Sequence, residues 1–107
     1  MSAIVKTFEP PYYAVIFTSL RTDGDHGYAE MARKMDELAK EQVGYLGIES
    51  ARENLGITVS YWKDLESIVK WHENAEHRLA QSKDYETWYQ SFKVRICRVE
   101  RDYAFER

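Results

Sequence analysis

The chain has 107 residues, of which 44% are hydrophobic, 14% aromatic and 31% charged, with a formal net charge of -3 and one cysteine. These values predict a single soluble domain spanning 1–107, and a lone cysteine favours a reducing, cytoplasmic compartment. The balanced charge argues against nucleic-acid binding, and no stretch approaches the roughly 18–20 apolar residues of a membrane span.

The first half of the chain predicts an arm, a strand and a helix. Charged residues and prolines precede the first apolar run, so we expect residues 1–10 to form an extended arm without a signal peptide. Residues 12–21 are rich in aromatic and β-branched side chains, which is typical of a strand. After a loop rich in Gly and Asp, apolar residues spaced by three and four predict a helix over 28–42, with Gly44 as a left-handed cap.

The second half predicts two strands over 45–52 and 56–61, a helix over 64–81, a further helical turn over 82–89 and a strand over 92–105. Asp64 is a suitable N-cap for the second helix. In the last strand the apolar positions change parity at Cys97, which predicts a β-bulge and a tail that reaches across to a partner chain. Cys97 itself is expected to be a packed, unreactive thiol.

The predicted order β-α-β-β-α-β is that of a ferredoxin-like α+β fold, a four-stranded antiparallel sheet with two helices on one face. Alternate residues of a strand face opposite sides, and both faces of the first strand are mostly apolar. Two helices cover only one of these faces. A second copy of the chain is the simplest cover for the other, which predicts a homodimer; the alternative is a central strand with a half-exposed apolar face.

Three segments carry a family resemblance: G-Y-L-G-I-E over 44–49, S-Y-W-K-D over 60–64 and W-H-E-N-A-E-H over 71–77. Trp62 is followed by an Asp two residues later, by His72 ten residues later and by His77 five residues after that. From about 12 to 105 the chain resembles the antibiotic biosynthesis monooxygenase family, and residues 88–101 look like an uncharacterised bacterial branch of it. The resemblance implies a dimeric α+β barrel, in which two sheets pack face to face with the helices outside.

His72 is the candidate catalytic residue. The apolar face of its predicted helix consists of Leu65, Ile68, Val69, Ala75 and Leu79. His72 lies near the centre of this face, so it should point into the space between helix and sheet. An imidazole there would hydrogen-bond a substrate, accept a proton or ligate iron. The alternative is a core histidine satisfied by a backbone carbonyl or a tyrosine hydroxyl.

Further candidates for a substrate-binding site are Trp62, Trp71, Tyr13, Phe17, Tyr61 and His77. The two tryptophans would roof a pocket over an aromatic ligand, and the tyrosines and the phenylalanine would add hydroxyls and ring faces. Core or rim packing is the alternative for the tryptophans. His77 falls on the polar side of the helix, where a solvated or capping histidine is the alternative, and no set of Cys and His residues completes a metal site.

The resemblance leaves two classes of function. The family includes cofactor-free monooxygenases of aromatic polyketides, haem-degrading enzymes and members with no known reaction, so the fold alone does not settle the activity. The first class is a cofactor-independent monooxygenase, with a haem-binding relative as its variant. Against haem, the haem-degrading members carry an asparagine in the first strand, and residues 12–21 have none. The second class is a non-catalytic dimer that binds a small apolar molecule or serves assembly only.

Overall fold

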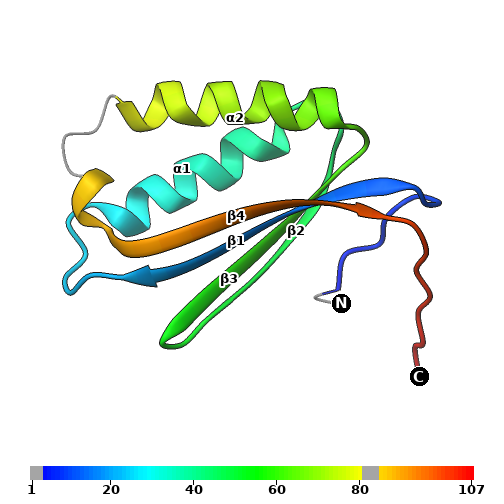
Figure 1. The fold of residues 1–107 in the computed structure, drawn as a ribbon, viewed down its shortest axis with the longest axis horizontal. Coiled ribbons are helices and arrows are strands. Elements are labelled where there is room, and N and C mark those ends of the chain that lie inside the picture. Colours follow the sequence, from blue (N-terminus) through cyan, green and yellow to red (C-terminus); the bar gives the residue numbers. More distant parts are fainter. Residues whose placement is uncertain (1–3, 81–84) are drawn as a thin grey trace.

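The computed structural model describes residues 4–80 and 85–107, a four-stranded sheet with two helices on one face (Figure 1). Its elements in chain order are β1 (Tyr12–Arg21), α1 (Tyr28–Lys40), β2 (Tyr45–Arg52), β3 (Leu55–Trp62), α2 (Leu65–Ala80), a 3-10 turn (Tyr85–Thr87) and β4 (Tyr89–Val99). The strands lie in the order β2-β3-β1-β4, and every neighbouring pair is antiparallel. The predicted ferredoxin-like βαββαβ fold is confirmed.

Polar groups at both ends of α1 explain its limits. The Asp25 carboxylate accepts the backbone N–H groups of Gly27 and Ala29 at 3.0 and 3.1 Å, which satisfies donors left free at the start of a helix. At the other end, the N–H groups of the two residues after Lys40 bond to carbonyls three residues back, a tighter geometry than that of an α-helix. The helix therefore ends at Lys40, before the predicted limit at residue 42.

Gly44 joins α1 to β2 in a conformation that suits glycine. Its φ of +88° lies in the left-handed region, as predicted, and a Cβ there would collide with the side chain of Ser67 on α2. This close approach brings the end of α1 beside α2. There the Nδ2 of Asn74 donates a hydrogen bond to Oε1 of Gln42 at 2.9 Å. The two helices therefore lie side by side over the sheet.

Asp64 caps α2, as predicted. Its Oδ1 accepts the backbone N–H of Ser67 at 2.8 Å, and hydrogen bonds from the hydroxyl and the backbone of Ser67 lower the pKa of this carboxyl. Within the described residues the helix ends at Ala80; its predicted end at Gln81 and the start of the predicted turn over 82–89 lie outside them. No helix in the described ranges is long and apolar enough to cross a membrane.

β4 begins earlier and ends earlier than predicted. It runs from Tyr89 to Val99, whereas the prediction was a strand over 92–105. Residues 100–107 form a tail without strand pairing. The apolar residues of this tail, Tyr103 and Phe105, are exposed, so they do not extend the alternating pattern of the strand.

The predicted β-bulge at Cys97 is wrong. Ala14 pairs with Cys97 and Val15 with Ile96 in continuous register, and the shift in this strand pair comes after Leu20 instead. The change of apolar parity has another cause, because β4 carries apolar side chains on both of its faces. Cys97 is a half-buried free thiol.

The core lies between the sheet and the helices. Its centre is the fully buried Trp62 at the end of β3, which packs with Ala39 of α1 and Ile68 of α2. Tyr13 and Val15 of β1 contact this cluster. Because residues two apart in a strand share a face, the odd-numbered residues of β1 are the ones that face the helices.

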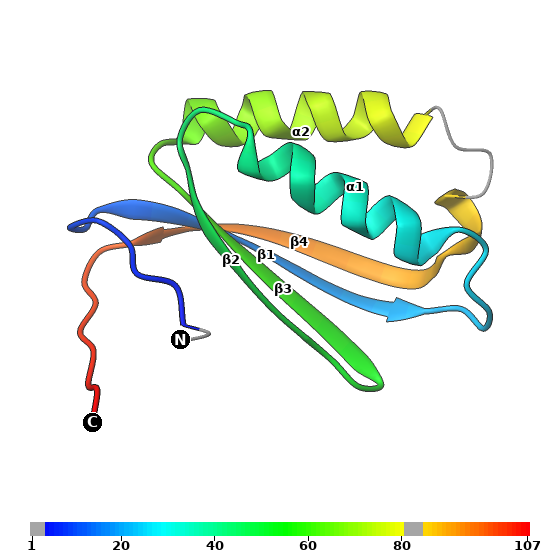
Figure 2. The same cartoon turned by 180° about the vertical axis from the view of Figure 1, so that it is seen from behind.

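The other face of the sheet carries no helix, and both terminal segments lie on that side (Figures 1 and 2). Leu55 and Ile57 of β3 are exposed there, beside Leu20 of β1. The N-terminal arm reaches the same side, where the backbone N–H of Val5 donates to Oε2 of Glu49 at 3.0 Å. The exposed apolar strip is the surface that the predicted homodimer would bury, and the dimer itself stays a prediction.

Candidate functional site

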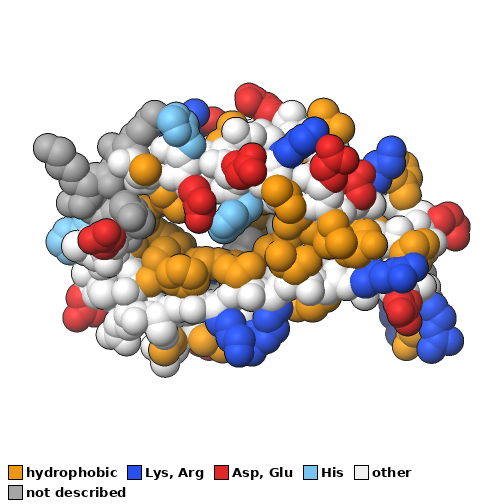
Figure 3. Space-filling model, turned by 45° about the horizontal axis from the view of Figure 1, so that its top comes forward, with side chains coloured by type: hydrophobic (Ala, Val, Ile, Leu, Met, Phe, Trp, Pro, Cys, Tyr) orange, Lys and Arg blue, Asp and Glu red, His pale blue; other side chains and the backbone are white. Residues whose placement is uncertain are grey.

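An apolar cleft separates α2 from β4 on the helix-covered side of the sheet (Figure 3). Its floor consists of Phe92, Val94 and Ile96, which pair with helix-facing residues of β1 and therefore point to the same side as the helices. These side chains are nevertheless 60, 45 and 56% exposed. The helices thus cover the centre of the sheet and leave this edge strand open.

One flank of α2 forms the opposite wall. Leu65 and Val69, one turn apart, are 50 and 56% exposed, whereas Ile68 is buried. Asn74 bonds to Gln42 and so marks the flank that faces α1. At about 100° per residue, Leu65 and Val69 lie on the side of α2 turned away from α1 and toward β4.

His72 belongs to this cleft flank and not to the buried face. Its side chain is 67% exposed, and its Nε2 lies 3.0 Å from Oε1 of Glu76, one turn further along the helix. The predicted position in the middle of a buried stripe is therefore wrong. α2 is rotated so that Ser67 and Ile68 are its buried residues, which turns the flank with His72 toward the cleft opening. The alternative of a core histidine is excluded for the same reason.

Trp62 of β3 and Trp71 of α2 pack against each other in the core between the sheet and the helices. Their rings stack with centroids 5.9 Å apart and an interplanar angle of 22°. The Trp62 Nε1 donates to Oγ of Ser60 at 2.8 Å, so its polar atom is satisfied inside the protein. Tyr13 packs against the same cluster. These three predicted site residues therefore belong to the hydrophobic core, and the two tryptophans take the core-packing role given above as their alternative.

Phe17 lies where the cleft reaches the start of β4. Its ring stacks on Phe92 at 5.4 Å and meets Tyr89 edge-on at 5.5 Å. Tyr28, at the start of α1, contacts Tyr89 edge-on at 5.8 Å. Burial, followed by the neighbouring phenol of Tyr28, raises the pKa of Tyr89, which keeps its hydroxyl neutral. Phe17 therefore joins an aromatic floor at this end of the cleft.

Tyr61 lies on the other face of the sheet and does not share the cleft. It pairs with Ala14, and because it precedes the helix-facing Trp62 its side chain points the opposite way. Its hydroxyl donates to Oε1 of Glu49 at 2.6 Å, and its ring meets Tyr12 edge-on at 6.0 Å. Burial and this hydrogen bond raise the pKa of Tyr61.

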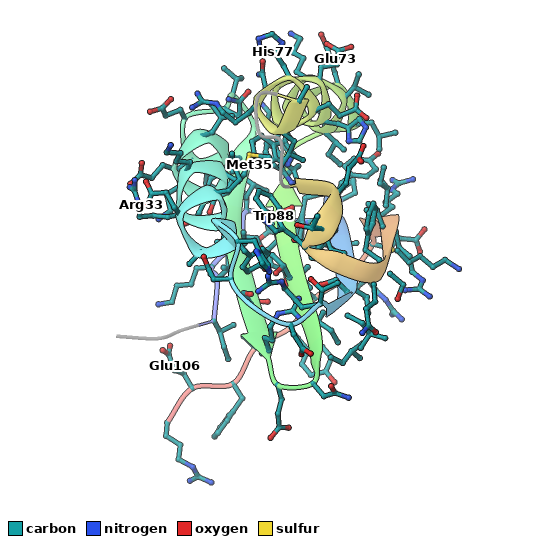
Figure 4. The ribbon with its side chains drawn as sticks, turned by 90° about the vertical axis from the view of Figure 1, so that its left-hand side faces the viewer. Arg33, Met35, Glu73, His77, Trp88 and Glu106 are labelled. Atoms are coloured by element: carbon teal, nitrogen blue, oxygen red, sulfur yellow. The ribbon has the colours of Figure 1, made fainter. Side chains whose placement is uncertain are left out.

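His77 is exposed and points away from the sheet, on the same outer side of α2 as Glu73 (Figure 4). It therefore does not approach the cleft floor. In the part of the chain that the structure describes, no three His, Cys, Asp or Glu side chains come together in a way that would hold a metal ion.

Sequence reasoning missed the floor of the cleft. In the sequence, Phe92, Val94 and Ile96 were used only to predict a strand. The pattern also held a signal for an exposed apolar surface. β4 carries these residues on one face and Cys97 and Val99 on the other. A strand that is apolar on both faces needs cover on both, and the two helices supply little of it here.

Two other hollows lie outside this cleft. One, of about 360 Å³, opens between the end of α1 and the start of α2 and is lined by polar residues such as Gln42, Asp64 and Lys70. The other, of about 220 Å³, lies at the far end of the sheet beside Leu20 and Leu55, and it borders the cleft at Phe92. Neither is lined by His72 or by any other predicted site residue.

Comparison with known proteins agrees with this architecture. The uncharacterized protein YqjZ of Bacillus subtilis (strain 168) is 46% identical over 108 residues, which cover 99% of this chain and 95% of YqjZ. Solved structures with the same fold include those of SnoaB and MhuD. SnoaB, a cofactor-independent oxygenase from Streptomyces nogalater, has a TM-score of 0.67 at 10% identity over 89% of this chain and 98% of its own. MhuD, solved with manganese protoporphyrin IX, has a TM-score of 0.66 at 15% identity over 87% of this chain and 99% of its own.

A family model described as Monooxygenase af470-like matches residues 21–97, from the last residue of β1 into β4. The matched region contains α1, α2 and the residues of α2 and β4 that form the wall and floor of the cleft, but not Phe17. The predicted relationship to the antibiotic biosynthesis monooxygenases is confirmed, and the chain belongs to the Monooxygenase af470-like family.

Proposed function

We propose that the protein binds a small aromatic or apolar molecule in the cleft between α2 and β4 and oxidises it without a bound cofactor, as a homodimer. The observation that carries this proposal is the exposed apolar row on the helix-facing side of β4, formed by Phe92, Val94 and Ile96. Burying apolar surface is favourable by about 25 cal/mol of free energy per Å², so a ligand that covers this row would be bound there. A groove between a helix and a strand suits a small, flat molecule.

Family membership and the fold shared with SnoaB support the class of reaction. In such a reaction the substrate itself donates the electrons. A carbon acid such as anthrone loses a proton from its CH₂ group, and the delocalised anion transfers one electron to O₂. The two radicals combine into a peroxide anion, which takes up a proton and loses water. Anthrone and O₂ thus yield anthraquinone and H₂O.

His72 is the proton acceptor in this proposal. It lies on the cleft flank of α2, and Glu76 orients its ring through the 3.0 Å contact. A positioned general base contributes about 10²–10⁴-fold to a rate. Phe17 and Phe92, which stack on each other, would align the rings of an aromatic substrate.

The structure of MhuD with manganese protoporphyrin IX favours haem as a second candidate ligand. The residues of this chain do not fit a haem-iron site. An iron ligand is best held inside a closed pocket, whereas the side chain of His72 is 67% exposed at the rim of the cleft and its Nε2 is engaged by Glu76. His77 points away from the sheet (Figure 4).

Oxygen uptake with anthrone as the probe tests the proposal. The protein should raise the rate above the spontaneous oxidation and consume one O₂ for each anthraquinone formed. Ile96→Glu places a charge on the cleft floor and should abolish this increase. Val43→Glu, the same change at an exposed position after α1, should leave it intact.

Two results would contradict the proposed reaction. If the wild type binds anthrone without raising the rate, the protein is a non-catalytic binder. If added haem gives a Soret shift that His72→Ala removes, the cleft binds haem and the cofactor-free mechanism fails.

A further inference from the structure

An arginine stands at the end of the cleft floor. Across the sheet, Arg52 of β2 pairs with Gly56 of β3, Gly56 with Ser19 of β1, and Ser19 with Phe92 of β4. Ser19 faces the helices, as does the rest of this row. Phe92 is the first residue of the cleft floor, so the row leads from Arg52 directly to the cleft.

The side chain of Arg52 crosses β3 and reaches β1, toward the cleft. A Cβ at Gly56 would collide with it, so the absence of a side chain at this position lets the arginine lie across β3. Its Nη2 donates to Oγ of the buried Ser19, and its Nη1 lies 3.4 Å from the Ser19 carbonyl oxygen. Neighbouring strands are about 4.8 Å apart, so the positive charge lies roughly one strand spacing from Phe92.

A second arginine is fixed at the same end. Arg21 donates from Nε to the Trp88 carbonyl at 3.1 Å and from Nη2 to the Gly24 carbonyl at 3.2 Å. Its guanidinium carbon lies 3.5 Å from the ring centroid of Tyr28. These contacts hold its charge beside the aromatic end of the cleft.

Both charges act on this end of the cleft. The positive charges of Arg52 and Arg21 oppose the increase in the pKa of Tyr89, whose ring contacts Phe17 on the floor. Within residues 4–80 and 85–107, no carboxylate lies within ion-pair distance of either arginine. An arginine has five N–H donors, and Ser19 engages only part of those of Arg52.

We propose that Arg52, with Arg21 behind it, forms an anion-binding end of the cleft, so that the ligand is an aromatic molecule with a negatively charged oxygen. The apolar body of the ligand lies along Phe92, Val94 and Ile96, and its oxyanion accepts hydrogen bonds from Arg52. This inference rests on the proposed function, because it uses the same cleft. It adds a class of substrate: aromatic carboxylates, or phenols and ketones that react as their oxyanions.

A matched pair of probes tests the inference, 2-naphthoate and its neutral analogue 2-naphthamide, with affinities measured by calorimetry. The wild type should bind the carboxylate about ten-fold more tightly, as expected for charge-assisted hydrogen bonds. Arg52→Gln should remove this preference and leave the affinity for 2-naphthamide unchanged. Arg52→Lys, which keeps the charge, should retain part of the preference.

Arg33→Gln is the matched control, since it removes one positive charge on the outer side of α1 (Figure 4). It should leave the preference intact. Equal affinity of the wild type for both probes, or a preference that survives Arg52→Gln, would overturn the anion site while the apolar cleft stands. Failure of both probes to bind would overturn the cleft and the anion site together. A melting temperature measured for each variant separates a lost site from lost folding.

Discussion

The hydroxyl of Tyr61 donates to Oε1 of Glu49 at 2.6 Å on the face of the sheet that the helices leave uncovered. On the same face, the hydroxyl of Tyr12 donates to Oδ2 of Asp102 at 2.5 Å. Each bond needs a protonated phenol, because the hydroxyl is the donor. The pair of bonds ties β2 and the C-terminal tail to the centre of the sheet.

These phenols predict a loss of stability at alkaline pH. Burial and the bond to Glu49 raise the pKa of Tyr61, so in the folded protein it keeps its proton above the usual value of about 10. The folded state then holds more protons than the unfolded state, and the free energy of unfolding falls as the pH rises above about 10. Denaturant titrations between pH 8 and 11 should show a smaller decrease for Tyr61→Phe than for the wild type. An identical decrease in both proteins would contradict this assignment.

A second prediction concerns assembly. Val15 and Phe17 face the helices, so the partner surface is the opposite face, where Ile57 and Leu55 are exposed. We expect a homodimer in sedimentation equilibrium. Ile57→Asp would bury an unpaired charge in the interface and should yield monomers or unfolded chains. Val43→Asp, the same kind of change at an exposed position away from that face, should remain dimeric, and a folded wild-type monomer would refute the interface.

The exposed position of His72 separates its catalytic role from its structural one. His72→Ala removes a surface side chain, so the melting temperature should not change. If His72 accepts the substrate proton, the rate of anthrone oxidation should fall by about 10²–10⁴-fold. His77→Ala, on the outer side of the same helix, should leave both quantities unchanged. A full rate in His72→Ala would remove the only base proposed for the cleft.

Two neighbouring residues of α2 test which of its sides is buried. Ile68 is buried against Trp62, so Ile68→Ala should lower the free energy of unfolding by about 2–5 kcal/mol. Val69 is exposed on the cleft wall, and Val69→Ala should change stability by no more than about 0.5 kcal/mol. Urea denaturation measures both. Similar losses in the two variants would mean that the helix is rotated differently.

Much of the fold could be read from local patterns. The apolar periodicity of residues 12–21 and 45–62 predicted β1, β2 and β3 to within one residue at each end, because strand alternation depends on near neighbours. Asp64 was predicted as a cap, since a carboxylate three residues before a free N–H is a local arrangement. The prediction of a bulge at Cys97 was wrong, because the alternation of residues shows which of them share a face but not whether one face or both are apolar.

The cleft was beyond such patterns. Local patterns were enough to predict the order of the elements, the residues that share each face of a strand, and the presence of apolar residues on both sides of the sheet. Three features follow from long-range packing instead: α2 turns His72 away from the core to the rim of the cleft, Trp62 stacks with Trp71 in the core, and Arg52 reaches across Gly56 to Ser19. The reason is physical: the rotation of a helix over a sheet is set by packing among residues far apart in the chain. A shift of one residue turns the side chains of a helix by about 100° and exchanges the two faces of a strand.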